Sequence, residues 1–340
     1  DRSVMSISRF FPAILLILLL GTISCEQVFL DEAPAEDAVS IFEEAWTFAD
    51  QEYSFFSFKG IDWDDVYSRY RPQVQENMSE EALFEVMADM LFELRDGHVN
   101  LRSPFNLSRN WEWYLNSPEN FNAANLERTY FQRNQQFVGS LVIWEFADVG
   151  YIRYGSFSSP LADDDIDLVI NKFQDKKGII FDVRNNGGGS LSNVFRLVRR
   201  FTDQTRTLAA QREKNGPGRN DFSDWSGYSV SPEGPLQYTK PVIVLTNRRC
   251  YSATTFFCTM MQELPNVTLV GDTTGGGGGA PSATELANGW TLRVSTTQLG
   301  TIDGFNVEDG LPPDVRIDMD PELEARGIDS MLEFAISELN

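Results

Sequence analysis

GIIFDVRNNGGGS, residues 178–190, is a short apolar run that ends in polar residues and three consecutive glycines. An apolar run of this length, bounded by turn residues, is typical of a strand that is buried on both faces. Successive glycines let backbone N–H groups converge on one point, as a binding site for an anion or oxyanion requires. A flexible turn is the alternative interpretation of the same glycines, and residues 178–190 alone leave both open.

The segments around this run alternate between strand and helix patterns. Strands are expected over residues 149–154, 178–183, 242–246 and 268–271, and helices over 165–173, 191–201, 253–264 and 331–339. Such alternation indicates an α/β layer with a mostly parallel sheet, in which ligands gather at the carboxyl ends of the strands. Residues 202–236 are polar and contain Gly and Pro, so we expect them to run over the surface.

The N-terminal half predicts a helical subdomain. Apolar residues recur three or four positions apart between residues 38 and 94, as in amphipathic helices. Asp62 is expected to cap a helix that ends near Pro72, and Ser79 to begin the next one. The expected division is a helical subdomain at 38–101, a small irregular and β segment at 102–148 with strand candidates at 126–131 and 141–146, and an α/β core at 149–340.

Two residues could carry acyl-transfer chemistry. Ser252 stands between the apolar run 242–246 and an apolar helix, where a helix N-terminus would support an oxyanion next to a serine nucleophile. A helix-capping serine is the alternative interpretation. His98 is the single histidine of the chain, and imidazole exchanges protons near neutral pH. A lone histidine without a catalytic task remains the alternative for this residue.

The first residues are typical of a secretory signal peptide. Arg9 precedes an apolar run over residues 10–20, and small residues lead to Cys25. We expect a bacterial lipoprotein signal at 1–25, with lipid on Cys25, and an acidic tether at 26–37. An ordinary signal peptide or an uncut membrane anchor are the alternatives, although the apolar run is short for a membrane span.

Composition excludes several classes of function. The formal net charge of −22 argues against nucleic acid and against electrostatic adhesion to anionic lipid. No Cys/His cluster has the spacing of metal ligands, so neither a metal site nor a cofactor is expected. The run at 275–279 lacks the Gly-Lys-Ser/Thr ending of a phosphate loop and is expected to be a flexible or close-packed loop. Cys250 and Cys258 could form a disulfide or remain two unpaired thiols.

Taken in order, several short motifs resemble the tail-specific serine peptidases, and within them the branch similar to the tricorn protease core. The resemblance covers about residues 38–338. The motifs that carry it are, in chain order, Phe42, Trp46 and Tyr53; Gly60-Ile61-Asp62-Trp63; Asp96-Gly97-His98; Asp182-Val183-Arg184-Asn185-Asn186-Gly187-Gly188-Gly189; Thr246-Asn247 with Ser252-Ala253; and Val307-Glu308-Asp309-Gly310-Leu311-Pro312-Pro313-Asp314.

This resemblance implies a ClpP/crotonase-like α/β sandwich core and a catalytic set. It implies Ser252 as nucleophile, His98 as general base and Glu308 in support, with the N–H groups of Gly189 and Ala253 as the oxyanion hole. The family's other design places a lysine base after the serine, and this chain has no lysine beyond Lys240. Gly97 departs from the tricorn pattern, which has a serine there, and residues 103–148 are too few to hold the PDZ-like domain that many members carry.

The sequence therefore predicts a serine endopeptidase of the bacterial cell envelope that acts on proteins or peptides. Its domain would face the periplasm or the cell surface, and lipid would be its contact with the membrane. A non-catalytic binding module of the same fold and an esterase-type acyl hydrolase are the alternatives. The sequence does not indicate an oligomeric state.

Overall fold

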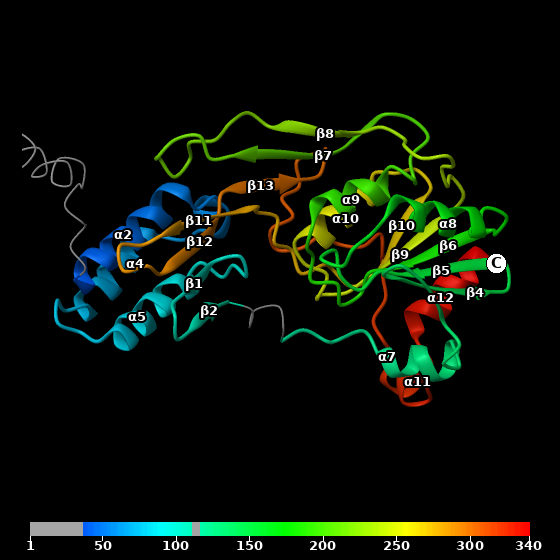
Figure 1. Ribbon diagram of the computed structural model, residues 1–340, viewed down its shortest axis with the longest axis horizontal. Helices are drawn as coiled ribbons and strands as arrows, with labels where there is room; N and C mark the ends of the chain where they lie inside the picture. Colours follow the sequence, from blue (N-terminus) through cyan, green and yellow to red (C-terminus); the bar gives the residue numbers. More distant parts are fainter. Residues whose placement is uncertain (1–36, 111–115) are drawn as a thin grey trace, which may run out of the picture.

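The computed structural model describes residues 37–110 and 116–340. Figure 1 shows an elongated molecule with a helical subdomain at one end and an α/β core at the other. A long two-stranded hairpin, β7 (Arg206–Glu213) and β8 (Ser226–Val230), extends from the core along the helical subdomain. The predicted class, a helical N-terminal region followed by an α/β core, is confirmed.

The core is built on a seven-stranded sheet in the order β14-β10-β9-β6-β5-β4-β3. Its parallel strands are β14 (Val315–Arg316), β10 (Val267–Gly271), β9 (Val242–Thr246), β6 (Gly178–Asp182) and β5 (Val149–Arg153). The antiparallel strands β4 (Leu141–Phe146) and β3 (Gln136–Val138) complete one edge. The four core strands expected from the sequence are thus present and adjacent, and the sheet also takes in residues 136–146.

Both faces of this sheet are covered, which explains why its central strands are continuously apolar. One face packs against α8 (Asp163–Phe173), α9 (Leu191–Val198) and α10 (Ala253–Gln262), and the other against α12 (Ser330–Leu339). Successive strand residues point to opposite faces. Ile179 and Phe181 accordingly belong to the first core, and Ile180 to the second.

The helical subdomain contains α2 (Ala38–Glu52), α3 (Phe56–Lys59), α4 (Trp63–Tyr70) and α5 (Glu80–Phe92). Its helices begin where the sequence predicts, because the side chains of Asp62 and Ser79 accept backbone N–H groups of α4 and α5. After α4, a short 3₁₀ turn, η1 (Arg71–Gln73), contains Pro72.

A four-stranded antiparallel sheet backs these helices, in the order β11-β12-β1-β2. It combines β1 (Asn100–Arg102) and β2 (Leu107–Arg109) with β11 (Pro281–Glu285) and β12 (Thr291–Ser295). Chain from far along the sequence therefore completes the core of the helical subdomain. The turn that carries His98 connects the helices of this subdomain to its sheet, because it lies between α5 and β1.

Two segments differ from expectation. Residues 126–131 do not form a strand: α7 (Ala123–Asn125) continues into a π-helical turn, η2 (Leu126–Tyr130). Residues 202–236 were expected to run over the surface, and the sequence did not predict that they include the hairpin β7–β8, which pairs with β13 (Thr297–Gly300) in a third sheet. The remaining short helix, α11 (Pro321–Ala325), precedes α12.

Other expectations concern the cysteines and the membrane. Cys250 and Cys258 are both buried and free of disulfides. The expected signal segment 1–25, with Cys25, and most of the tether 26–37 lie outside the described residues. Within the described residues, no helix has the length and apolar character that crossing a membrane requires.

Candidate active site

Ser252 occupies a strained turn between β9 and α10. Its backbone has φ 58° and ψ −122°, a conformation that residues other than glycine rarely adopt and that costs about 1–3 kcal/mol. The Ser252 N–H donates to the Gly276 carbonyl at 2.9 Å, and the Ser252 carbonyl accepts from Phe256 N–H at 3.0 Å. These two bonds hold the turn, and strain of this kind is common at catalytic positions.

His98 reaches Ser252 from the other subdomain. Its Nε2 lies 2.9 Å from the Ser252 Oγ, across 154 positions of sequence. The imidazole is 7% exposed and packs against the Tyr251 ring, with 4.9 Å between ring centroids. Since Nε2 faces a hydroxyl, the neutral ring that accepts its proton carries hydrogen on Nδ1. Nδ1 is buried and has no hydrogen-bond partner among the described residues.

The charge state of His98 is set by burial and by charged neighbours. Burial lowers the pKa of His98 to about 4, and the cations Arg293 and Lys59 act in the same direction. The Asp96 carboxylate and the Gly279 carbonyl oppose this shift. At neutral pH the ring is therefore neutral and able to accept a proton.

Asp96 fixes the turn that carries His98. One oxygen, Oδ1, accepts the His98 backbone N–H at 2.7 Å and the Tyr251 hydroxyl at 3.4 Å, and Oδ2 accepts the Ser295 hydroxyl at 2.8 Å. Burial alone would raise the pKa of Asp96, but Lys59, His98 and these donors hold it below its ordinary value. Asp96 is therefore an anion beside the imidazole, a role that the sequence analysis did not assign to it.

Glu308 is buried and paired with Lys59, the last residue of α3. The Lys59 Nζ lies 2.7 Å from Glu308 Oε1, and Oε2 accepts the Gly278 N–H at 2.9 Å. Lys59 also donates to the carbonyls of Leu94 and Arg95, at 3.2 and 3.1 Å. Within the described residues, Glu308 thus acts on the His98 turn through Lys59, without a hydrogen bond to the imidazole.

The buried carboxylate of Glu308 has an unusual affinity for protons. Burial and the nearby charge of Asp96 raise the pKa of Glu308 to about 8, against the lowering effect of Lys59. Conversely, burial alone would lower the pKa of Lys59, but Glu308 and Asp96 raise it above its ordinary value. Lys59 is therefore a buried cation that contacts Glu308 and acts on Asp96 through its charge, and the sequence did not indicate it because its partner Glu308 lies 249 positions away.

The glycine run lies directly against the Ser252 turn. A Cβ on Gly188 would meet the Tyr251 carbonyl oxygen at 2.6 Å, the Ser252 Cβ at 2.9 Å and the Ala253 nitrogen at 3.0 Å. The Gly188 N–H is held by the Asn186 side chain. Among described groups, none accepts the N–H of Gly189 or of Ala253, so both amides are available to a ligand at Ser252. This is the arrangement that an oxyanion needs.

A cavity of about 170 Å³ opens beside Ser252. Its wall includes Gly189, Ala253 and, toward the β7–β8 hairpin, a set of larger mostly apolar side chains: Leu191, Tyr228, Phe256 and Leu299. The loop that begins at Gly277 and the side chain of Arg293 form the rest of the wall. This cavity could accept an apolar side chain of a peptide beside the serine hydroxyl.

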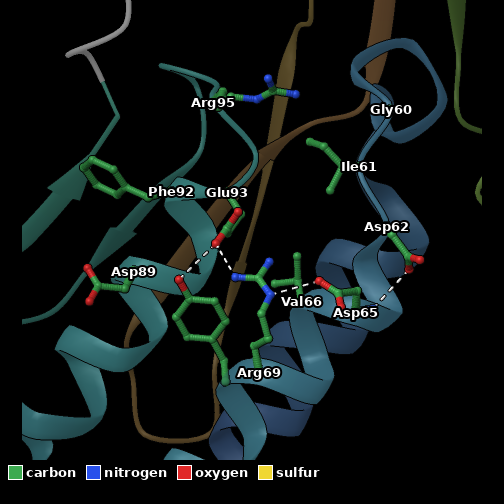
Figure 2. Close-up of a pocket in the computed structure, with 11 residues that line it drawn as sticks. Gly60, Ile61, Asp62, Asp65, Val66, Arg69, Asp89, Phe92, Glu93 and Arg95 are labelled. Carbon is green, nitrogen blue, oxygen red and sulfur yellow. Dashed lines mark hydrogen bonds and ion pairs between the residues drawn. The ribbon is translucent and has the colours of Figure 1, made fainter.

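A larger cavity, about 540 Å³, lies between α4 and α5 and does not include the serine or the histidine. Figure 2 shows some of its charged side chains turned toward one another: Arg69 binds Asp65 and Glu93, and the Tyr70 hydroxyl also donates to Glu93. These groups satisfy each other and provide no nucleophile. Within the described ranges, no cluster of three or more His, Cys, Asp or Glu residues has the arrangement of a metal site.

Comparison with known families gives two matches along the chain. Residues 34–92 match the tricorn protease C1 domain, and residues 148–317 match peptidase family S41. Among curated proteins, carboxy-terminal processing protease CtpA of Bacillus subtilis is 29% identical over 175 residues, which are 51% of this chain and 35% of that protein. The matched region thus spans about a third of the length of this relative.

Solved structures share the architecture over most of the chain. A crystal structure from Parabacteroides merdae has a TM-score of 0.85 and 39% identity, and the match covers 89% of this chain and 97% of that one. The tricorn protease has a TM-score of 0.53 and 16% identity, covering 89% of this chain and 36% of that one. The second likeness concerns the fold alone.

Proposed function

The chain belongs to peptidase family S41, and on this premise we propose that it is a serine endopeptidase that cleaves peptide bonds in proteins or peptides. The observation that carries the proposal is the 2.9 Å contact between Ser252 Oγ and His98 Nε2. It joins a strained serine to the single imidazole of the chain. The amides of Gly189 and Ala253, which donate to no described group, belong to residues that line the same cavity as this serine.

The proposed reaction follows from this geometry. Ser252 Oγ attacks the scissile carbonyl carbon while its proton passes to His98 Nε2. The N–H groups of Gly189 and Ala253 donate to the oxyanion that forms. His98 then gives its proton to the leaving amine as the C–N bond breaks, which leaves an acyl-enzyme. Water attacks this ester with His98 again as base, the bond between the carbonyl carbon and Ser252 Oγ breaks, Oγ takes the proton back from His98, and the carboxyl product leaves.

Asp96 and Glu308 would support the imidazole in different ways. Asp96 stabilises the positive charge that His98 acquires, because it is a buried anion next to the ring. Glu308 holds Lys59, and Lys59 holds the carbonyls before Asp96. We therefore assign Glu308 and Lys59 as positioning residues and keep the catalytic role for Ser252 and His98.

A serine-directed fluorophosphonate probe and a peptide library test the function. Native protein should react with the probe and cleave library peptides, and heat-unfolded protein should do neither. A non-catalytic binding module would be inert in both assays. An esterase-type acyl hydrolase would react with the probe and hydrolyse simple esters while leaving the library intact, so each alternative has its own outcome.

Glu308→Gln is expected to lower kcat/KM by about 10- to 100-fold, because a small displacement of catalytic groups has effects of this order. Above pH 8, where Glu308 is ionised, the amide leaves Lys59 without its anion and loosens the carbonyls that Lys59 holds. Asp309→Asn is the matched control, since the neighbouring Asp309 is exposed, and it should stay within about twofold of wild type. Steady-state kinetics on one library peptide measures both. A larger loss for Asp309→Asn would contradict the assignment of Glu308.

We also propose that Cys25 is lipidated and that the enzyme is anchored in the bacterial cell envelope. The support is the sequence pattern of residues 5–25. Expressed in a bacterium, the full chain should partition into the detergent phase, and Cys25→Ala should shift it to the aqueous phase. Equal partitioning of the two proteins would contradict the anchor and leave the peptidase proposal untouched.

A further inference from the structure

Arg293 lies on the face of the four-stranded sheet that looks toward the active site. Its neighbours in β12, Leu292 and Val294, are fully buried in the helical subdomain, so the Arg293 side chain projects from the opposite face. Ser295 shares the face of Arg293, two positions along the strand, and its hydroxyl bonds Asp96. Arg293 is thus adjacent to the His98 turn, in agreement with the effect of its charge on the His98 pKa.

Arg293 also lines the cavity that contains Ser252, yet its side chain has no ion pair or hydrogen bond with the described residues. The side chain is partly buried, and burial lowers its pKa. The contrast with other arginines is clear: Arg184 and Arg200 are fully buried, and each is paired with carboxylates. Asp96 acts on Arg293 electrostatically but forms no ion pair with it, and a partly desolvated guanidinium without a direct carboxylate partner is well suited to bind an anion.

The sheet face that carries Arg293 also carries other arginines, although the chain is strongly acidic. In the register of the sheet, Arg109 of β2, Asn100 of β1 and Arg293 form one row, so the two arginines project from the same face. Arg102, two residues after Asn100 in β1, projects from the same face and is exposed. A face with three arginines, in a chain of net charge −22, is a local attraction for negative groups.

The position of Arg293 relative to His98 determines which part of a substrate it would contact. In the proposed reaction, His98 protonates the leaving amine, so the leaving fragment lies on the His98 side of the serine. The apolar side chains of the cavity, including Leu191 and Phe256, come from α9 and α10. Arg293 comes from β12, next to the His98 turn, and therefore faces the leaving fragment.

We propose that Arg293 binds a carboxylate of the substrate on the leaving-group side of the scissile bond. This inference rests on the proposed peptidase function. The carboxylate is the terminal group of the peptide chain or an Asp or Glu side chain. A guanidinium binds either of them through two parallel hydrogen bonds.

The test uses one peptide that library profiling shows to be cleaved, made in four forms. The first has a free C-terminal carboxylate and the second a C-terminal amide. The third is an amide with Asp placed after the scissile bond, and the fourth an amide with Asp placed before it. Wild type should favour the first form, the third, or both over the second, by about 10- to 100-fold in kcat/KM.

Arg293→Gln should reduce this preference to about onefold while cleavage of the amide peptide and labelling by the fluorophosphonate probe persist. Arg102→Gln is the matched control, because it removes a charge from the same face without altering the cavity wall, and it should keep the preference. The proposal is overturned if wild type cleaves the first three forms equally, if Arg293→Gln retains the preference, or if Arg102→Gln loses it equally. Preference for the fourth form would also overturn it.

The experiment distinguishes failure of the carboxylate site from failure of the peptidase proposal. If the wild-type protein reacts with the probe and cleaves all four peptides at the same rate, the enzyme assignment stands and the carboxylate site fails. If it neither reacts with the probe nor cleaves the library, the peptidase proposal fails and the carboxylate site fails with it.

Discussion

Replacing Ser252 with alanine is expected to lower kcat by about 10⁴-fold or more and to abolish labelling by the fluorophosphonate probe. The variant removes the Oγ that would form the acyl-enzyme and leaves the neighbouring amides in place. Because residual catalysis by an oxyanion site can persist without the nucleophile, a trace of hydrolysis above the uncatalysed rate is compatible with this expectation.

The substitution should leave the fold intact. Alanine at position 252 has the same backbone restriction as serine, so the strain of the turn is unchanged, and the bonds of the Ser252 backbone to Gly276 and Phe256 do not involve the hydroxyl. Circular dichroism and Tm should match wild type. Ser337→Ala, in α12 and exposed, is the control and should label and cleave normally. Retention of wild-type kcat in Ser252→Ala would place the nucleophile elsewhere.

The central strands and the serine turn could be predicted because their signals are local. Residues 178–182 and 242–246 are buried on both faces of the sheet, and each strand is accordingly apolar up to its last residue. Elements without a clear local signal were not predicted. Strand β7 buries only Leu208 and Ala209, and one of its two partner strands, β13, lies some 85 positions later, so its sequence carries a weak strand signal.

The same distinction applies to the site. Ser252 and His98 each stand next to a recognisable pattern, and the family resemblance named them together. Lys59 and Asp96 had no such signal: a lysine at the end of a short helix is ordinarily solvated, and its burial follows from Glu308, which arrives from the far end of the chain. Arg293 reads as one polar residue within an alternating strand, and only the sheet register shows that it faces the cavity.

His98→Ala is expected to lower kcat/KM by about 10² to 10⁴-fold, the usual contribution of general acid–base catalysis. Without the imidazole, the Ser252 proton has no acceptor and the leaving amine has no proton donor. Labelling by the fluorophosphonate probe should slow sharply as well. His98→Gln preserves more of the buried volume and should be equally slow, which separates loss of the base from loss of packing.

The pH dependence of kcat/KM tests the role of His98 independently. Protonation of Nε2 blocks its role as acceptor, so kcat/KM falls as the pH drops through the pKa of the free enzyme. Burial, with Arg293 and Lys59, lowers the pKa of His98 to about 4 against the opposing effects of Asp96 and the Gly279 carbonyl. The titration of His98 should therefore leave kcat/KM unaffected between about pH 8 and pH 5 and lower it below pH 5.

This acid limb should disappear in His98→Ala, whose low residual rate no longer depends on the imidazole proton. It should move to higher pH in Arg293→Gln, because that substitution removes a cation that disfavours the protonated ring. The measurement is kcat/KM from pH 3.5 to 8.5, with circular dichroism at each pH to exclude unfolding. A limb near pH 6.5 that His98→Ala leaves unchanged would assign the titration, and the base, to another group.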